Sequence, residues 1–309
     1  MIQKTEWIWM NGRLVKWEAA KIHVLTHALH YGSGVFEGMR VYPTKQGPAV
    51  FRLDDHIKRL FRSASFYSMK IPFSEQELIE AAVEVVRENK LDSGYIRPIA
   101  FYGYGVMGLS PDGAPVEAAI AAWPWGSYLG EEGLVKGIRC KISSWRRIDP
   151  KTLPTQAKAC GNYLNSILAK TEALRAGFDE AIMLNLKGKV AECSGENIFM
   201  VKKERLVTPP ADAGVLEGIT RDSVIRIAEA FGLKVFEKNI KKNEVFSADE
   251  LFLTGTAAEV TPVREVDGRK IGSGGRGPIT EKLQKKYFEV VRGEETRYRD
   301  WLTFVSRTQ

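Results

Sequence analysis

Two short segments of the sequence combine residue types that bind anions. Gly218-Ile219-Thr220 precedes a stretch with helical periodicity, and the first backbone N–H groups of a helix have no partner within the helix. Residues 254–258 (Thr-Gly-Thr-Ala-Ala) place hydroxyl groups beside small residues that let the backbone approach a ligand. Either segment alone is typical of an ordinary cap or turn. Together they indicate a cradle for a phosphate or carboxylate group, but nothing in their spacing shows that they meet.

Two glycine patterns raise the alternative of a dinucleotide site. Residues 103–108 match G-x-G-x-x-G after a predicted strand, and residues 272–277 match it again. A dinucleotide-binding loop needs a helix that begins at its last glycine and an acidic residue on a later strand. The first match runs into the turn-forming residues 109–113, and the second follows only a short strand and lacks the acidic residue. We interpret both as loops, and a dinucleotide-dependent oxidoreductase stays a distant alternative.

The size and charge of the chain narrow the class of protein. It has 309 residues, a net charge of +7 and a hydrophobic share of 44%, which is ordinary for a globular protein of roughly two domains. The charge admits anionic partners, but the basic clusters, such as Arg146-Arg147, are short and scattered, and no nucleic-acid-binding motif accompanies them. We expect a solvated basic surface and no nucleic-acid partner; a basic nucleic-acid-binding module remains a third hypothesis.

The cysteines, histidines and apolar stretches indicate neither a metal site nor a membrane-spanning segment. Cys140, Cys160 and Cys193 are too widely spaced for a disulfide framework, and His27 and His30 have no third ligand nearby, so we expect no metal. The longest apolar stretches are too short to span a bilayer, and the N-terminal stretch carries charges where a signal peptide has an apolar block. We expect a cytoplasmic enzyme with no membrane partner.

Local patterns predict mixed helices and strands in the first third. Asn11-Gly12 predicts a hairpin turn between short strands. Residues 54–64 carry apolar residues at helical spacing, and Ser74 with Glu77 forms a capping box for the next helix. Two strands are then predicted, over residues 95–105 and 116–123.

The remaining chain begins where apolar density falls and glycines gather, so we predict an interdomain loop at 126–133 between a smaller domain, 1–125, and a larger one, 134–309. Thr220 is predicted to cap a helix that Gly232 ends. The other predicted elements are a strand over 136–145, a helix over 161–177, a hairpin turning near Lys187-Gly188, a strand over 244–255 leading into a turn, and a helix over 279–291.

Longer segments carry a more specific signal. The main ones are HALHYGSGVFEGMR (27–40), PTQAKACGNYLNS (154–166), AECSGENIFMV (191–201) with LEGITRD (216–222), and TGTAAEVTPV (254–263). Supporting segments are DDHIKRL (54–60), YIRP (95–98) and AAWPWGSYLG (121–130). In these segments, which keep one order over nearly the whole chain, the sequence resembles the fold-type IV pyridoxal-phosphate enzymes, and specifically the branched-chain amino-acid aminotransferases. The resemblance implies an α/β (α+β) fold of two domains: a smaller N-terminal α/β domain and a larger, cofactor-binding C-terminal domain with a β-barrel-like core and surrounding helices.

The resemblance also implies which residues bind the cofactor, pyridoxal 5′-phosphate. Lys158 would form the Schiff base and move the proton of the substrate α-carbon. Glu192 would pair with the pyridine nitrogen, which makes the ring an electron sink, and Tyr163 would bond the 3′-oxygen. Without the resemblance, Lys158 would be interpreted as a surface lysine, Glu192 as an exposed strand carboxylate and Tyr163 as a residue that packs its helix. The phosphate would be bound by Arg59, Gly218, Ile219, Thr220 and Thr256.

One local signal opposes the role of Arg59. On its helix, Arg59 lies nearly opposite the apolar stripe of Ile57, Leu60 and Phe61, which alone predicts exposure to solvent. The phosphate role of Arg59 therefore rests on the resemblance.

The same resemblance implies a substrate site shared by two subunits of a homodimer. Tyr95 with Thr256-Ala257 would hold the α-carboxylate, and Arg97, with Arg40, would meet the second carboxylate of glutamate. The apolar cage would suit valine, leucine and isoleucine, because each methylene provides only about 1–3 kcal/mol of discrimination. Gly38 would be a further substrate-binding residue. The cage residues are Phe36, Trp125, Tyr128 and Tyr163, with Tyr31 and Leu109 from the partner.

The implied function is ping-pong transfer of the amino group of L-leucine, L-isoleucine or L-valine to 2-oxoglutarate. D-amino-acid aminotransferase, aminodeoxychorismate lyase and amine transaminase remain alternatives within the fold, although residues 30–40 and 95–98 favour the branched-chain group. The partners would be amino acids and 2-oxo acids, and the assembly a homodimer or a hexamer of dimers. Cys160 and Glu217 depart from the family pattern without removing a catalytic group.

Overall fold

The computed structural model describes residues 2–126 and 129–306, and the chain divides into two compact units. Unit 1 consists of Met1–Gly126, Ala157–Gly161 and Val290–Gln309; unit 2 consists of Ser127–Gln156 and Asn162–Glu289. The change of unit after Gly126 falls at the glycine-rich stretch. The predicted loop at 126–133 nevertheless includes the start of a helix, α4 (Glu131–Lys136).

Two later segments return to unit 1, so the predicted assignment of all of 134–309 to one domain differs from the structure. Val35 forms an antiparallel bridge with Ala159. Strand β18 (Leu302–Phe304) pairs antiparallel with β5 (Gly47–Phe51). Both segments, residues 157–161 and 290–309, belong to unit 1 because they pair with residues far away in the sequence. Local composition does not reveal such pairing.

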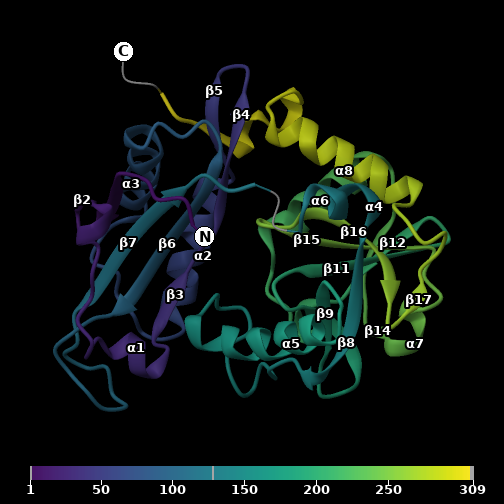
Figure 1. The fold of residues 1–309 in the computed structure, drawn as a ribbon, viewed down its shortest axis with the longest axis horizontal. Helices are drawn as coiled ribbons and strands as arrows, with labels where there is room; N and C mark the ends of the chain where they lie inside the picture. Colours follow the sequence, from purple (N-terminus) through teal and green to yellow (C-terminus); the bar gives the residue numbers. More distant parts are fainter. Residues whose placement is uncertain (1, 127–128, 307–309) are drawn as a thin grey trace. The chain divides into compact units, whose positions relative to one another are not determined.

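An antiparallel sheet forms the centre of unit 1, in the order β18-β5-β4-β6-β7-β1-β2, with β3 also paired to β6 (Figure 1). Asn11 and Gly12 both have positive φ, 49° and 93°, as a tight two-residue hairpin turn requires, and the predicted hairpin is confirmed. The strands besides β5 and β18 are β1 (Trp7–Met10), β2 (Arg13–Lys16), β3 (Gly34–Phe36), β4 (Met39–Thr44), β6 (Gly94–Tyr102) and β7 (Val116–Trp123).

The helices of unit 1 pack on this sheet. Helix α3 contacts β1 and β7, and α2 contacts β3 and α3. The predicted capping box is confirmed, because the Ser74 hydroxyl accepts a hydrogen bond from the Glu77 N–H while the Glu77 carboxylate accepts one from the Ser74 N–H. The helices are α1 (His27–Tyr31), α2 (Leu53–Ser65) and α3 (Glu75–Glu88), with short 3-10 turns η1 (Trp17–Ala19) and η4 (Thr296–Trp301).

Unit 2 is built on a sheet in the order β13-β12-β11-β15-β16-β8-β9-β10-β14, with β17 also paired to β16. The β12–β13, β8–β16 and β8–β9 pairs are parallel and the others antiparallel. The strands are β8 (Ile138–Arg146), β9 (Glu180–Leu184), β10 (Lys189–Cys193), β11 (Asn197–Lys202), β12 (Arg205–Thr208), β13 (Val235–Glu237), β14 (Ile240–Lys241), β15 (Glu250–Gly255), β16 (Glu259–Val266) and β17 (Arg269–Lys270).

Helices cover this sheet (Figure 1): α5 contacts β8 and β9, α6 contacts β13 and β15, and α4 contacts β16. The buried interior is apolar and includes Phe199 and Phe252, whose rings stack with centroids 5.0 Å apart. The remaining helices are α5 (Tyr163–Arg175), α6 (Ile219–Ala230), α7 (Lys242–Val245) and α8 (Pro278–Val291), with 3-10 turns η2 (Cys160–Asn162) and η3 (Ala211–Ala213). Within the described residues, no helix combines the length and apolar character that crossing a membrane requires.

The predicted turn at Lys187-Gly188 is confirmed between β9 and β10. Two local predictions in unit 2 are wrong. Helix α6 has Gly218 as its N-cap, without a side-chain cap, so Thr220 is a buried residue of the first turn rather than the cap. The predicted strand over 244–255 is a strand only from Glu250 onward, because the preceding residues complete α7, where Glu244 accepts a hydrogen bond from the Lys241 N–H.

Candidate active site

Lys158 lies in a loop of unit 1 that two neighbouring elements hold by its backbone. The Lys158 N–H donates to the Ser63 hydroxyl of α2 at 3.0 Å, and its carbonyl accepts from the Phe36 N–H at 3.0 Å. The adjacent Ala157 and Ala159 are buried, whereas Lys158 is half-buried with its Nζ 5.0 Å from the centroid of the Phe36 ring. The backbone of this lysine is therefore fixed, and its small neighbours leave room around its amine.

Arg59 is buried, with 6% of its surface exposed, so the predicted exposure is wrong. Its Nε and Nη2 donate to the two carboxylate oxygens of Glu37 at 2.6 and 2.9 Å. Helical periodicity counts apolar neighbours only and misses a face that packs against a buried carboxylate. Glu37 and His56, which sequence reasoning also missed, complete this cluster: His56 Nδ1 lies 2.7 Å from Glu37 Oε2.

Burial and charge act in opposite directions on Glu37. Burial raises the pKa of this carboxyl, but the Arg59 guanidinium and His56 outweigh it and hold the pKa well below its usual range. Burial lowers the pKa of His56, although Glu37 opposes that change. An ionised carboxylate and a guanidinium thus neutralise each other inside unit 1.

The predicted substrate residues of unit 1 come together around Tyr95. A Cβ at Gly38 would lie 1.8 Å from the Tyr95 hydroxyl oxygen, so only glycine fits there. The Tyr95 and Trp125 rings meet edge to face with centroids 4.5 Å apart. The Arg97 guanidinium lies 4.9 Å from the Phe36 ring centroid and 5.2 Å from that of Tyr95, and its Nη2 donates to the Tyr95 hydroxyl at 3.3 Å.

The two arginines predicted to bind the second carboxylate, Arg97 and Arg40, differ in their hydrogen bonds. Arg97 Nε is buried and has no hydrogen-bond partner within residues 2–126 and 129–306, and a buried cationic donor of this kind requires an acceptor such as a carboxylate. Arg40 instead donates to the carbonyl oxygen of Gly126 at 2.7 Å. Arg97 can therefore bind an anion beside the rings of Phe36, Tyr95 and Trp125, which we call the aromatic wall.

Tyr31 and Leu109 lie on the surface of unit 1, with exposed fractions of 44% and 88%. His27 connects them: its ring centroid is 4.6 Å from that of Tyr31, and its Nε2 lies 2.8 Å from the carbonyl oxygen of Gly108. Its other nitrogen lies 2.7 Å from the Ser33 hydroxyl. Both residues predicted to contact a partner subunit are thus exposed, and His27 joins the segments that carry them.

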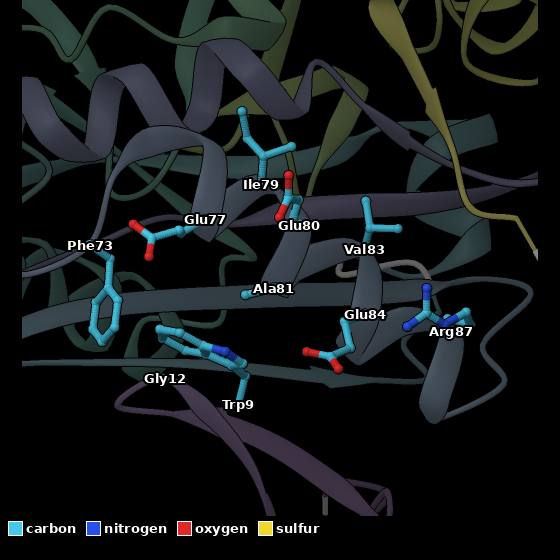
Figure 2. Close-up of a pocket in the computed structure, with 10 residues that line it drawn as sticks. All are labelled: Trp9, Gly12, Phe73, Glu77, Ile79, Glu80, Ala81, Val83, Glu84 and Arg87. Carbon is cyan, nitrogen blue, oxygen red and sulfur yellow. The ribbon is translucent and has the colours of Figure 1, made fainter.

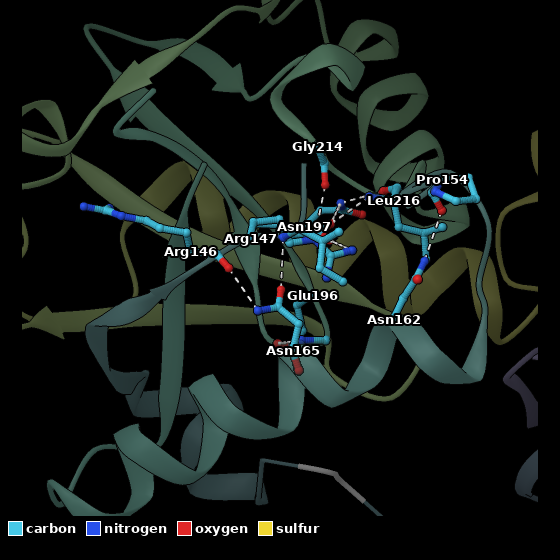
Figure 3. Close-up of polar contacts among 12 residues, drawn as sticks. Arg146, Arg147, Pro154, Asn162, Asn165, Glu196, Asn197, Gly214 and Leu216 are labelled. Atoms are coloured by element: carbon cyan, nitrogen blue, oxygen red, sulfur yellow. Dashed lines mark hydrogen bonds and ion pairs between the residues drawn. The ribbon is translucent and has the colours of Figure 1, made fainter. Parts of the chain in front are cut away.

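Glu192 is the centre of a second group, in unit 2. Its Oε1 accepts from Arg147 Nη2 at 2.8 Å, and its Oε2 accepts from Asn197 Nδ2 at 3.1 Å and from the Leu216 N–H at 2.9 Å. Arg147, treated above as part of a surface cluster, is only 6% exposed, and it also donates to the carbonyl oxygen of Gly214. Figure 3 shows Arg147, Asn197 and Leu216 close together. The buried negative charge of Glu192 is thereby compensated and oriented.

The start of helix α6 adjoins this carboxylate through Asn197. The Asn197 amide also donates to the Leu216 carbonyl oxygen at 2.8 Å, and a Cβ at residue 218 would lie 2.0 Å from Asn197 Oδ1. Position 218 therefore has to be glycine for the helix to begin here. The N-terminus of α6, with Ile219 and Thr220 in its first turn, carries the partial positive charge that attracts anions to helix starts.

The other predicted residues of unit 2 have distinct positions. Thr256 and Ala257 are half-buried in the turn between β15 and β16, and β15 pairs with β11 so that Thr254 lies opposite Asn197. Tyr163 is half-buried and begins α5. Tyr128 lies outside the described residues. The approach to α6, through Leu216 and Gly218, and the end of β15, through Thr254, thus both adjoin Asn197, which sequence spacing did not reveal.

The glycine patterns do not form dinucleotide-binding loops. Between residues 103–108 and the next element, β7, the described chain has no helix. Helix α8 does begin at Pro278, directly after the second pattern, but the Glu250 carboxylate accepts hydrogen bonds from the N–H groups of Ile279 and Thr280. The protein's own carboxylate thus occupies the position of a phosphate.

A groove of about 530 Å³ in unit 1 lies apart from these groups. Trp9 of the first hairpin, Ile79 of α3 and Phe73, which precedes α3, are among the residues that line it (Figure 2). None of the predicted site residues is among its lining residues, so it has no part in the candidate site.

Comparison with known proteins places the chain in a family. Residues 34–266 match the model of the family described as amino-transferase class IV. The branched-chain-amino-acid aminotransferase of Pseudomonas aeruginosa is 54% identical over 298 residues, which cover 96% of this chain and 97% of that protein.

Solved structures agree. The crystal structure of the Escherichia coli branched-chain amino acid aminotransferase superposes with a TM-score of 0.96 at 47% identity, covering 98% of this chain and 100% of that chain. The T.th. branched-chain amino acid aminotransferase, complexed with N-(5′-phosphopyridoxyl)-L-glutamate, has a TM-score of 0.94 at 48% identity, covering 98% of this chain and 99% of that chain. The expected fold is therefore confirmed, and this chain belongs to the class IV aminotransferase family.

Proposed function

We propose that this chain is a branched-chain-amino-acid aminotransferase that uses pyridoxal 5′-phosphate to transfer the amino group of L-leucine, L-isoleucine or L-valine to 2-oxoglutarate. The names of the relatives support the reaction, and the ligand of the T.th. enzyme supports the cofactor and L-glutamate. The observation that carries the proposal is the hydrogen-bonded connection, through Asn197, between the Glu192 carboxylate and the phosphate-binding type of helix start at Gly218.

The chemistry of the available groups fits the cofactor. Lys158 offers an amine for the aldehyde, and Glu192 offers a compensated carboxylate for the ring nitrogen. Tyr163 offers a phenol for the ring oxygen. The α6 N-terminus, Arg59 and the Thr256 hydroxyl offer donors for the phosphate. When bound, the cofactor supplies a conjugated ring that takes up the electrons of the bond broken at the substrate α-carbon.

The remaining chemistry belongs to side chains of this chain. Lys158 Nζ takes the proton from the substrate α-carbon as a general base and, as a general acid, would deliver it to C4′, the aldehyde carbon of the free cofactor. Glu192 holds a proton at the ring nitrogen, because its own charge is kept in place by Arg147 and Asn197. The Tyr95 hydroxyl and the Thr256-Ala257 turn bind the α-carboxylate.

The same aromatic wall serves both substrates. Phe36 and Trp125 exclude water from a branched side chain. Arg97, which lies over the Phe36 and Tyr95 rings and whose buried Nε lacks a partner in the described chain, binds the second carboxylate of 2-oxoglutarate. Discrimination among valine, leucine and isoleucine is expected to be small because they differ by at most one methylene.

We also propose a cytoplasmic homodimer in which each subunit presents Tyr31 and Leu109 to its partner. The exposure of Leu29, Tyr31 and Leu109, at 59%, 44% and 88%, supports this, because a protein surface rarely gathers large apolar side chains without a partner. Light scattering on the purified protein distinguishes a monomer, a dimer and a hexamer built from dimers.

The deciding experiment compares the parent protein with Lys158→Ala, and with Lys151→Ala, an exposed lysine nearby, as the control. We expect a yellow cofactor band that borohydride bleaches, and ping-pong exchange between L-leucine and 2-oxoglutarate, in the parent and the control only. A Lys158→Ala protein with full activity would refute the proposal. Activity confined to D-alanine, to a primary amine, or to pyruvate release from aminodeoxychorismate would instead assign one of the related reactions.

A further inference from the structure

Glu37 and His56, which contact the proposed phosphate ligand Arg59, have no role in the chemistry described so far. Glu37 is 0% exposed, His56 1% and Arg59 6%. A buried carboxylate costs several kcal/mol in desolvation unless it is fully compensated. Glu37 receives four hydrogen bonds or ion-pair contacts: from Arg59 twice, from His56, and from the Gly38 N–H at 3.2 Å. Every one of these donors belongs to unit 1.

The pairing with Arg59 fixes the orientation of the guanidinium. Donation by Nε and Nη2 to the two oxygens of one carboxylate is the bidentate arrangement, which sets the plane of the guanidinium as well as its position. A single hydrogen bond would leave rotation about that bond. The direction of the Nη1 edge of Arg59 is therefore determined by Glu37.

Glu37 is itself held by the segment that carries the proposed substrate and lysine residues. The Glu37 N–H donates to the carbonyl oxygen of Pro98 at 2.9 Å, and the neighbouring Phe36 N–H donates to the carbonyl oxygen of Lys158. Besides Arg59, helix α2 contacts this region through His56 at Glu37 and through Ser63 at the Lys158 N–H. The position of Arg59 is thus tied to the position of the lysine backbone.

We infer that Glu37 is a positioning residue for phosphate binding, which acts by fixing the guanidinium of Arg59, with His56 as its second support. This inference rests on the proposed function, since it takes Arg59 as a ligand of the cofactor phosphate. The inference predicts that removing the Glu37 carboxylate weakens phosphate binding, whereas a purely electrostatic argument predicts the opposite. Removing the negative charge of Glu37 would strengthen a purely electrostatic attraction between Arg59 and a phosphate, whereas losing the orientation weakens binding.

The test measures the affinity of the cofactor-free protein for pyridoxal 5′-phosphate and for pyridoxal, which lacks the phosphate, by absorbance titration. The variants are Glu37→Gln, Glu37→Asp, His56→Gln and Arg59→Lys. Asp55→Asn is the matched control, because it also removes a carboxylate paired with an arginine, Arg52, and Asp55 lies on α2 as Arg59 does but is 43% exposed. Thermal melting of each cofactor-free variant verifies folding.

We expect Glu37→Gln to weaken pyridoxal 5′-phosphate binding roughly tenfold, the effect of losing one charge-assisted hydrogen bond, and to leave pyridoxal binding and the Asp55→Asn control unchanged. Equal weakening for both ligands would overturn the inference, as would unchanged or tighter phosphate-dependent binding. If Glu37→Gln fails to fold, Glu37→Asp and His56→Gln, which keep the buried charge, take its place. The quantity compared is then the ratio of the affinity for pyridoxal 5′-phosphate to the affinity for pyridoxal.

Arg59→Lys separates this inference from the proposal beneath it. If Arg59→Lys does not change the ratio of the two affinities, Arg59 is not a phosphate ligand, and that part of the proposed function fails. If Arg59→Lys lowers the ratio while Glu37→Gln does not, the phosphate role stands and the positioning role of Glu37 is refuted.

Discussion

The side-chain amide of Asn197 donates a hydrogen bond to the Glu192 carboxylate at 3.1 Å and another to the Leu216 carbonyl oxygen at 2.8 Å. One buried amide thus connects a strand, a carboxylate and the approach to helix α6. Replacing Asn197 with alanine is expected to destabilise the protein by about 1–3 kcal/mol, because two buried acceptors lose a donor, and to lower kcat. Urea denaturation and steady-state assays measure this, with the exposed Asn243→Ala as the control. An Asn197→Ala protein with unchanged stability would contradict the prediction.

Gly218→Ala tests the contact on the other side of the same amide. The new methyl group would overlap Asn197 Oδ1, 2.0 Å from the ideal Cβ position, so the start of α6 has to move. We expect a loss of about 1–3 kcal/mol in stability and weaker binding of pyridoxal 5′-phosphate. Gly275→Ala is the control, since a Cβ there meets nothing within 4 Å. Both variants are compared by thermal melting and absorbance titration; equal behaviour of the two would rule the overlap out.

Arg97→Met tests the dual use of the aromatic wall. Methionine keeps the apolar contacts with Phe36 and Tyr95 but loses the charged donors. We expect KM for 2-oxoglutarate to rise about tenfold or more, through loss of charge-assisted hydrogen bonds, while KM for 4-methyl-2-oxopentanoate changes little. Half-reaction kinetics with each 2-oxo acid measure the two effects separately. A parallel rise for both acids would show that Arg97 does not select the second carboxylate.

Glu196 predicts a specific dependence of stability on pH. It is buried beside Glu180, whose carboxylate contacts Lys170 at 2.5 Å and the Ser194 hydroxyl at 2.5 Å. Burial, and next the Glu180 charge, raises the pKa of Glu196 well above its usual value. The folded state therefore binds a proton that the unfolded state releases above a pH of about 4.5, and the stability that this proton provides falls as pH rises toward the raised pKa.

Glu196→Gln removes that titration while keeping the shape of the side chain. We expect the variant and the parent to have similar stability near pH 4.5, and the variant to gain relative to the parent with each step to pH 8. Urea denaturation across this range gives the difference. A constant difference at all pH values would contradict the raised pKa.

The sequence predicts some parts of this structure because their signals are local. The Asn11-Gly12 hairpin and the Ser74–Glu77 capping box depend on residues within a few positions of each other, and both are found where predicted. The burial of Arg59 and Arg147 could not be predicted in this way. Their compensating carboxylates, Glu37 and Glu192, lie 22 and 45 positions away, respectively.

The site residues were predicted by resemblance rather than by physical pattern, and the structure adds the residues that hold them. The side-chain partners of Glu37, His56 and Arg147 lie 19 or more positions away in the sequence. Asn197 joins Glu192, 5 positions away, to Leu216, 19 positions away. Their only sequence signal is their place inside the matched segments or beside them: Glu37 within 27–40, His56 within 54–60 and Asn197 within 191–201. The local rules describe elements, whereas buried polar clusters depend on which elements meet.

The pairing of β18 with β5 has a consequence for biosynthesis. The ribosome makes β5 about 250 residues before β18, and the lysine loop about 120 residues after Val35, its bridge partner. The N-terminal unit consequently emerges from the exit tunnel with the β5 edge of its sheet uncovered, and this edge stays uncovered until residues 302–304 have left the tunnel. Chaperones that shield open strand edges are therefore expected to bind the nascent chain at β5.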